Sequence, residues 1–550
     1  MKSINLALVT MLLLLHVKSL PEWAEKTLAT LSTDEKIGQL FMVSARADSS
    51  LMAQDKVVSN NHIATSNHMH QDYVVHLITD YYVGGVIYLG THTVWEQQAL
   101  THRFQSRANI PLLIGQDFEW GLSMRLTDCP PFPRAMTLSA AGRPDLAYKM
   151  GYTIGNQCRA LGVHINFAPV VDINTNPNNP IIGTRSFGDT AQRVIEYAAP
   201  YIQGMLDVGI IPCIKHFPGH GDTHVDSHCS LPTITHSKKY LEQTELMPFK
   251  TLIQHGIPAI MSAHLSVPSL DATETPATLS HAIITDLLRN TYNFDGLIIT
   301  DALDMAALTN AVKPAQVALQ ALLAGNDILL APSDVPGACT LIKNALLDGM
   351  LSTSELDEHV LRILRAKEWI FQTHSHSPVA PITTAEDLYP PQTMHLQQEL
   401  YNAACTVLYN HSHAIPLAKK NSKPWHVTAI GNGDPTSFLQ TLDAQGITAQ
   451  YHVIENALAE CKNTAVIIAL YGTPGYAQTI PVNAIDQIKT LKQANQTCVV
   501  VLFGSPYLAS SLPKTDALLL AYEDNTPAQQ AAAYVLTGVI RPQGVAPIQI

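Results

Sequence analysis

Residues 213–231, which read CIKHFPGHGDTHVDSHCSL, gather many groups that can exchange protons or bind polar ligands. They contain Lys215, four histidines and two aspartates, and the apolar run 210–214 leads into them. Pro218, Gly219 and Gly221 interrupt the stretch and indicate a loop rather than a helix. We therefore expect a buried strand that opens into a polar loop, the kind of segment on which proteins commonly carry reactive side chains.

Two features of the chain could together cleave a glycosidic bond. Asp301 follows the apolar run 296–300, and Asp226 stands two residues before His228, whose imidazole it could orient. A carboxylate nucleophile and a proton donor are the minimum for retaining glycoside hydrolysis, and a histidine exchanges protons near neutral pH. Each residue also has a structural interpretation, because Asp301 could cap a helix and Asp226 could fix a turn.

Other polar residues follow further apolar runs of the sequence, and they are Asp117, Arg185, Lys215, His216 and His264. The first four could hold sugar hydroxyls and an amide carbonyl of a carbohydrate substrate. For Arg185 the alternative is a structural ion pair with Asp172 or Asp189.

The histidines also suggest a metal site. His216, His220, His224 and His228 are spaced by four residues, which would align them on one face of a helix. The proline and glycines argue against that helix, and the sequence has neither an HExxH motif nor a second local Cys/His cluster. We therefore predict no metal and no cofactor, and we expect His220 and His224 to support the loop.

Eight apolar, β-rich runs alternate with helical patterns and would position these residues. Near-continuous apolar strands that alternate with helices are typical of a parallel sheet covered on both faces. Eight such units fit a (β/α)8 TIM-like barrel, whose active site lies at the carboxyl ends of the strands. The expected strands are 39–44, 83–89, 111–116, 164–171, 210–214, 258–263, 296–300 and 327–331.

The remaining patterns divide the chain into four regions. Residues 1–19 resemble a secretory signal peptide, with Lys2 before an apolar run that is too short to span a membrane. We expect export to the periplasm or the medium, the alternative being a buried N-terminal helix in a cytoplasmic protein. Residues 20–372 would form the barrel, 373–396 a linker rich in proline, serine and threonine, and 397–550 a doubly wound α/β sandwich domain.

Composition narrows the class of partner. Of 550 residues, 46% are hydrophobic and 14% charged, and the net charge of −12 comes with no basic cluster. This argues against nucleic acid as a partner. The eight cysteines are scattered, which favours buried thiols over a disulfide framework. We expect no membrane insertion once the signal has been removed, and the sequence leaves the oligomeric state open.

The stretch KHFPGHGDTHVDSH at 215–228 resembles the signature of family 3 glycoside hydrolases of the β-N-acetylglucosaminidase type. Six further motifs occur in the order found in that family, so the resemblance covers most of residues 30–370. They are QDFEWGLSMRL (116–126), NFAPVVDI (166–173), IIGTRSFGD (181–189), ELMPF (245–249), MSAHL (261–265) and GLIITDALDM (296–305).

The resemblance implies a two-step retaining mechanism. Asp301, rather than Asp304, would be the nucleophile, and His228 the general acid/base with Asp226 as its partner. The residues that would bind N-acetylglucosamine are Asp117, Arg185, Lys215 and His216, with His264 near the sugar. The expected substrate is an N-acetylglucosamine-containing glycan or muropeptide derived from peptidoglycan.

Two alternatives remain on the same scaffold: a phosphorylase, and an inactive sugar-binding protein. The chain also departs from the family pattern, because Trp120 stands where many members have a glycine. This departure leaves the preference for the leaving group open. The second domain resembles that of longer members, and we expect its Glu523 to be structural.

Overall fold

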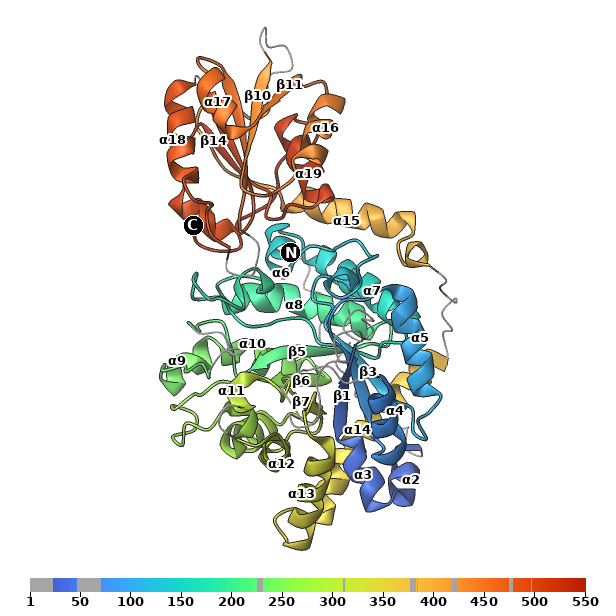
Figure 1. Ribbon diagram of the computed structural model, residues 1–550. Coiled ribbons are helices and arrows are strands. Elements are labelled where there is room, and N and C mark those ends of the chain that lie inside the picture. Colours follow the sequence, from blue (N-terminus) through green and yellow to red (C-terminus); the bar gives the residue numbers. More distant parts are fainter. Residues whose placement is uncertain are drawn as a thin grey trace, which may run out of the picture.

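The computed structural model describes residues 23–46, 71–224, 231–309, 312–375, 382, 384–417, 424–473, 478–495 and 497–550. The chain forms a large N-terminal part, coloured blue to yellow in Figure 1, and a smaller C-terminal part, coloured orange to red. The expected signal peptide and the pair Asp226–His228 lie outside the described residues. Within these ranges, no helix combines the length and the apolar character needed to cross a membrane.

Eight parallel strands form the predicted barrel, in the order β7-β6-β5-β4-β3-β2-β1-β8. A bridge between Ile299 and Ile328 brings the two ends of this sheet together. Every residue of these strands is buried, as expected for apolar strands covered by helices. The strands are β1 (Phe41–Ala45), β2 (Gly85–Tyr88), β3 (Leu113–Gln116), β4 (Ile165–Asn166), β5 (Ile211–Phe217), β6 (Ala259–Ser262), β7 (Leu297–Thr300) and β8 (Leu329–Leu330).

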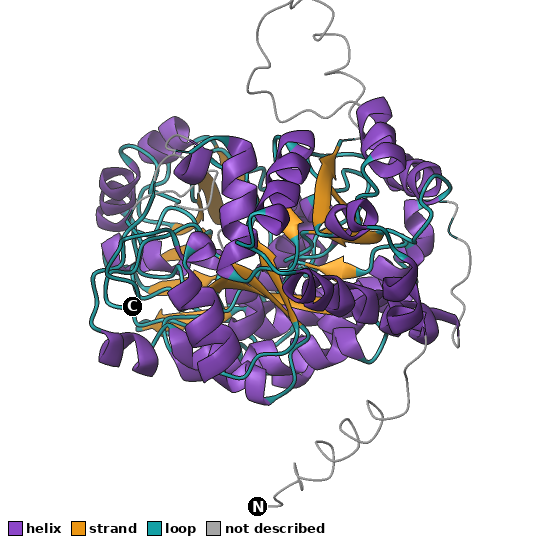
Figure 2. Cartoon of the chain, turned by 90° about the horizontal axis from the view of Figure 1, so that it is seen from below, coloured by secondary structure: helices purple, strands orange, loops and turns teal. Residues whose placement is uncertain are grey.

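Helices surround the barrel strands, as Figure 2 shows from below. Local signals set their ends: Ser32 and Glu35 form a capping box at the start of α3. The helical segments are α2 (Trp23–Thr30), α3 (Thr33–Gln39), α4 (Gln71–Asp80), α5 (Val94–Gln105), α6 (Ala135–Ala140), α7 (Pro144–Ala160), α8 (Ala191–Leu206), α9 (Lys238–Gln243), α10 (Leu246–Gln254), η7 (Ala282–Thr291), α11 (Ala306–Thr309), α12 (Pro314–Ala324), α13 (Val335–Leu347) and α14 (Thr353–Ser375).

Asp327 joins the last two barrel strands to α14. Its carboxylate accepts hydrogen bonds from His359 Nδ1 at 2.8 Å, from Arg362 Nη1 at 3.0 Å and from the backbone N–H of Ile298 at 2.8 Å. Arg289 pairs with the same group. Burial alone would raise the pKa of Asp327, but Arg289, with His359 and Arg362, lowers it to about 2.

The lowered pKa of Asp327 predicts a defined loss of stability in acid. A carboxylate whose pKa falls from 3.8 to about 2 on folding stabilises the native state above pH 4. That contribution, about 2 kcal/mol, is lost as the pH falls through the folded pKa, about half of it by pH 3. Urea unfolding between pH 6 and pH 2.5 should show this slope in the wild type and a flatter one in Asp327→Asn. Parallel slopes would contradict the prediction.

The second domain contains a six-stranded sheet in the order β11-β10-β12-β13-β14-β9. Five of its strands are parallel, whereas β9 pairs antiparallel with β14. The strands are β9 (Thr406–Asn410), β10 (Trp425–Ile430), β11 (Ala449–His452), β12 (Ala465–Tyr471), β13 (Thr497–Phe503) and β14 (Ala517–Leu520).

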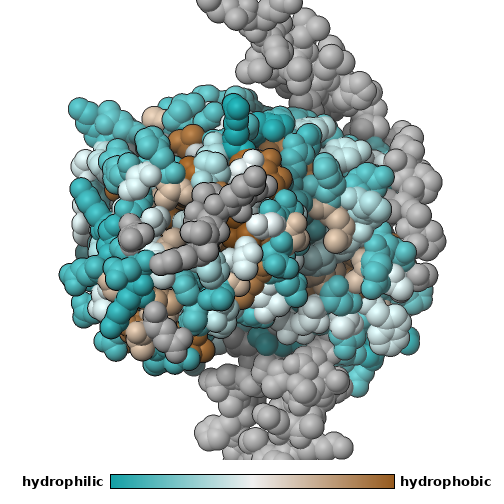
Figure 3. All heavy atoms as spheres, turned by 90° about the horizontal axis from the view of Figure 1, so that it is seen from above, coloured by the Kyte–Doolittle hydropathy of each residue, from teal (hydrophilic) through white to brown (hydrophobic). Residues whose placement is uncertain are grey.

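Helices cover both faces of this sheet, which confirms a doubly wound sandwich. Helices α17 and α18 pack with one set of strand residues, and α16 and α19 with the alternate set. The outer end of this domain, seen from above in Figure 3, is mainly hydrophilic with small apolar patches. The helices are α15 (Pro391–Ala404), α16 (Thr436–Ala444), α17 (Ile454–Glu460), α18 (Ala484–Ala494) and α19 (Thr526–Leu536), and α15 begins inside the stretch expected to be a linker.

Glu523 connects the two domains, which confirms its expected structural role. One carboxylate oxygen accepts hydrogen bonds from the backbone N–H of Arg134 at 2.9 Å and from the Thr137 hydroxyl at 2.7 Å. The other oxygen accepts one from the Tyr401 hydroxyl at 3.0 Å. Burial raises the pKa of Glu523 above its ordinary value, and Arg134 and these hydrogen bonds partly offset that effect.

Candidate active site

The barrel brings the predicted site residues of the described ranges to one end. Each of them lies at or just beyond the carboxyl end of a barrel strand: Asp117 after β3, Arg185 in the segment after β4, Lys215 and His216 near the end of β5, His264 after β6 and Asp301 after β7. Asp226 and His228 belong to the loop after β5, outside the described residues. Active sites of this fold occupy the same end of the barrel.

Lys215 and Arg185 lie in a chain of buried charges with two carboxylates of the β3 loop. Lys215 Nζ is 2.7 Å from Asp117 Oδ1 and 2.8 Å from Glu119 Oε1. Arg185 binds Glu119 through two parallel hydrogen bonds of 2.9 and 2.7 Å. The partially exposed Arg125 adds a contact of 2.7 Å to Asp117 Oδ2. Two buried cations thus balance the buried Glu119 and the half-buried Asp117 and leave a rigid polar wall.

The cations keep both carboxylates ionised. Burial would raise the pKa of Asp117, but Lys215 and Arg125 lower it to about 2. For Glu119 burial is likewise outweighed, by Arg185 and Lys215, and its pKa falls well below the usual range. The same two carboxylates raise the pKa of Lys215 despite its burial. The site therefore presents fixed charges, not exchanging protons, along this wall at neutral pH.

Glu119 pairs with two predicted site residues, Arg185 and Lys215, although the sequence alone assigned it no role. The alternative pairs proposed for Arg185 are both wrong, because Asp172 binds His216 and Asp189 accepts the backbone N–H of Gln549. One signal in the sequence could have pointed to Glu119. That signal is the second acidic residue two positions after Asp117. It would lie near Lys215 at the end of another strand, which would otherwise be buried with a single anion.

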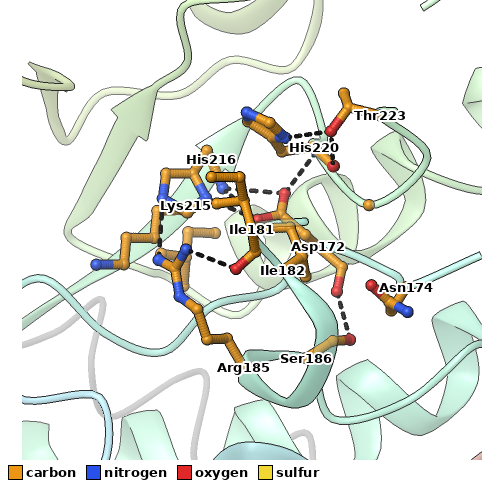
Figure 4. A network of polar contacts seen from close by, with 12 residues as sticks. Asp172, Asn174, Ile181, Ile182, Arg185, Ser186, Lys215, His216, His220 and Thr223 are labelled. Carbon is orange, nitrogen blue, oxygen red and sulfur yellow. Dashed lines mark hydrogen bonds and ion pairs between the residues drawn. The ribbon is translucent and has the colours of Figure 1, made fainter. Parts of the chain in front are cut away.

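Asp172 holds the start of the histidine-rich loop. Its side chain, 1% exposed, accepts the backbone N–H groups of His216 and His220 and lies 2.7 Å from His216 Nδ1. Nδ1–H of His216 donates to this carboxylate, so Nε2 carries the lone pair and faces Arg185, with Nη2 at 3.5 Å. Figure 4 shows these side chains converging on Asp172. The imidazole is thereby held in one orientation.

The segment that follows β5 turns sharply, as its proline and glycines predict. Gly219 has φ +126°, and a Cβ on Gly221 would lie 1.6 Å from the Ile173 carbonyl oxygen. His220 Nδ1 pairs with the Thr223 hydroxyl at 2.8 Å, and His224 Nδ1 lies 3.0 Å from Asn176 Nδ2. The expected supporting role of His220 and His224 is confirmed, and residues 218–224 form no helix.

Asp301 is fixed beside the strand end and remains partly exposed. Its Oδ1 accepts the Ala302 N–H at 2.8 Å, and its own N–H donates to the Ser262 carbonyl at 2.9 Å. Burial would raise its pKa, but His264 and His216 lower it below the usual range. The residue does not cap α11, which begins five positions later. An ionised, accessible and oriented carboxylate is what nucleophilic attack requires.

His264 contacts the backbone next to Asp301. Its side chain is buried, with Nε2 2.9 Å from the Ala302 carbonyl oxygen and Nδ1 2.9 Å from the Thr278 hydroxyl. These contacts hold the peptide that follows Asp301 and so orient the carboxylate. A direct contact of His264 with the sugar stays a prediction.

A barrel whose strand ends present a fixed carboxylate and a wall of paired charges defines an enzyme with a polar substrate. Residues 32–366 match the family model described as "Glycosyl hydrolase family 3 N terminal domain". This match spans more than half of the chain, which therefore belongs to family 3 of the glycoside hydrolases.

Individual relatives agree with the family assignment. The chain is 28% identical over 546 residues to "Beta-hexosaminidase A" of Pseudoalteromonas piscicida, which covers 86% of this chain and 90% of the relative. It is 35% identical over 302 residues to "Beta-hexosaminidase LpqI" of Mycobacterium tuberculosis, covering 53% and 77%. A solved β-N-acetylglucosaminidase from Paenibacillus sp. has 30% identity and a TM-score of 0.76, with 94% and 99% of the two chains covered.

Proposed function

We propose that this protein is an exo-acting retaining β-N-acetylglucosaminidase that removes terminal N-acetylglucosamine from peptidoglycan-type fragments. The observation that supports this best is that one barrel mouth holds both an accessible, ionised Asp301 and the polar wall. The wall consists of Asp117, Glu119, Lys215 and Arg185. The names of the relatives, which are hexosaminidases and β-N-acetylglucosaminidases, support the choice of sugar.

In the proposed first step, an Asp301 oxygen attacks the anomeric carbon while the bond to the leaving-group oxygen breaks. His228, oriented by Asp226, gives its proton to that oxygen. The product is a glycosyl ester of Asp301 and a free alcohol. In the second step water attacks the same carbon, His228 takes the proton of the water, and Asp301 leaves as a carboxylate. Two inversions at one carbon retain the β configuration.

Fixed charges on the wall would hold the sugar while it reacts. Asp117 can accept from sugar hydroxyls, and Lys215, Arg185 and His216 Nε2 lie along the same wall. Because these groups are already ordered by one another, binding would require little reorganisation of the site. Ordered donors and acceptors also discriminate strongly against a sugar that lacks a matching group.

A cavity beside this wall offers room for the remainder of the substrate. It has a volume of about 340 Å³ and lies between the domains, with Trp120 and Thr184 on the barrel side and Asn432, Thr473 and Asp524 on the other. Two of its lining residues, Trp120 and Thr184, are the sequence neighbours of the wall residues Glu119 and Arg185. Its size and its mixed polar and apolar lining suit a second sugar that bears a peptide. Export through residues 1–19 would place the enzyme where such fragments arise.

The products formed from 4-nitrophenyl N-acetyl-β-D-glucosaminide test the proposed function. With the full chain in phosphate buffer, proton NMR should first show the β anomer of free N-acetylglucosamine. The matching β-glucoside, which lacks the acetamido group, should react with a kcat/KM lower by about 10³-fold or more. N-acetylglucosamine 1-phosphate would identify a phosphorylase. The α anomer as first product would exclude retention, and no turnover would leave a sugar-binding protein.

A further inference from the structure

Three potential metal-binding side chains meet in the second domain, far along the chain from the barrel site. They are His426 on β10, His452 on β11 and Cys461 immediately after α17. One ligand atom of each lies within 4.8 Å of the other two. His426 Nδ1 and His452 Nε2 are only 2.9 Å apart. The sequence spacing of 26 and 9 residues matches no local metal motif, so tertiary structure alone assembles this group.

The topology of the sheet edge explains the encounter. Strands β10 and β11 are parallel, and their register pairs Thr428 with His452. Because side chains alternate between faces, His426 shares the face of Thr428 and lies diagonal to His452. Helix α17 packs over the same face, and its C-terminal end delivers Cys461. The thiol-bearing residue is fully buried, whereas the two imidazoles are partly exposed, so the group lies between the core and solvent.

The distances are close to those of a zinc site. Ligand atoms of a tetrahedral zinc centre lie roughly 3.3–3.8 Å apart, because Zn–N is about 2.0–2.1 Å and Zn–S about 2.3 Å. Small side-chain rotations would bring three atoms that are already within 4.8 Å to this geometry. Imidazole and thiolate ligands favour Zn²⁺ over Mg²⁺ or Ca²⁺, which prefer oxygen.

A buried hydroxyl on the same face supplies an independent observation. Thr428 is 0% exposed, and its Oγ1 has no hydrogen-bond partner among the described residues. In the strand register Thr428 lies opposite His452, and it is two residues from His426 on the same strand. A buried hydroxyl without a partner is costly, and a water molecule bound to a metal in this corner would provide one.

We propose that His426, His452 and Cys461 bind one Zn²⁺ ion, with water as the fourth ligand. On binding, the Cys461 thiol loses its proton to solvent. The imidazole that donates in the His426–His452 contact moves its proton to its other ring nitrogen, so that both facing nitrogens can coordinate. The ion joins the edge strand β11 and the short helix α17 to β10. It takes no part in the barrel chemistry.

Cobalt provides a direct spectroscopic test on the full-length, chelator-treated protein. Co²⁺ should bind at one equivalent per chain with a thiolate-to-metal charge-transfer band, and Zn²⁺ should displace it with a Kd of about 1 μM or tighter. Cys461→Ser should abolish the band. His426→Ala and His452→Ala should each weaken binding by about 100-fold or more, since even residues outside the ligand set cost 10–100-fold.

Cys405→Ser is the matched control, because Cys405 is also a buried cysteine at the C-terminal end of a helix in this domain. It should keep the band. Metal held instead by the histidine-rich loop of the barrel, which contains Cys229, would keep its binding and any thiolate band in Cys461→Ser. That result, or absence of binding, overturns the proposal. The melting temperature is a second measurement. Zn²⁺ should raise that of the wild type, whereas Mg²⁺ should not, and neither ion should change that of His452→Gln.

Discussion

Asp301→Asn is expected to lower kcat/KM for the N-acetylglucosaminide by about 10⁴-fold or more, equivalent to about 5 kcal/mol of barrier. The amide cannot form the glycosyl ester, yet it keeps the size of the carboxylate. Its Oδ1 can still accept the Ala302 N–H that now fixes Asp301. The loss should therefore appear in steady-state kinetics without a change in the unfolding transition.

Asp304→Asn is the matched control, since it removes a carboxylate three residues further along the same loop. Its kcat/KM should stay within about tenfold of the wild type. Trapping with a fluorinated sugar that keeps the 2-acetamido group, followed by peptide mapping, should label Asp301. Full activity in Asp301→Asn, or a label on another residue, would refute the assigned nucleophile.

Lys215→Met is expected to destabilise the barrel by about 3–5 kcal/mol at pH 7, because it removes one partner from a buried ion network. Lys215 is 3% exposed and lies within 2.8 Å of both Asp117 and Glu119. Without the ammonium, the counter-charges that remain among the described residues are Arg125 for Asp117 and Arg185 for Glu119. Urea unfolding, with the barrel transition resolved from that of the second domain, measures the difference.

The pH dependence separates this electrostatic cause from lost packing. Lys215 is a principal reason why the pKa of Asp117 is about 2. In the wild type, the stability that this lowered pKa supplies is present above pH 4 and lost as the pH falls toward 2. The variant has less of it to lose, so the two stability curves should converge in acid. Lys239→Met, at an exposed position, should change stability by less than about 0.5 kcal/mol. A constant gap between the curves would indicate packing.

The architecture of both domains could be predicted because it depends on local patterns. Each barrel strand is a short apolar run between helical patterns, and burial on both faces makes such runs nearly continuous. Strand β9 lacks such a pattern, because its residues are mostly half-buried and its partner, β14, lies about 110 residues later. Helix α17 has no clear pattern either, because seven residues contain too few turns for a helical period.

By itself, the sequence determined which residues stand at the ends of barrel strands, and thus that Asp117, Lys215, His216 and Asp301 share one mouth. Their order along the chain and the geometry of a parallel barrel require it. Only the tertiary structure decided the partners. Arg185 pairs with Glu119 rather than Asp172, and His426 meets His452 and Cys461, because ion pairs and ligand sets depend on side-chain positions within a few ångströms. Those positions follow from strand register and helix packing, which act between segments far apart in the sequence.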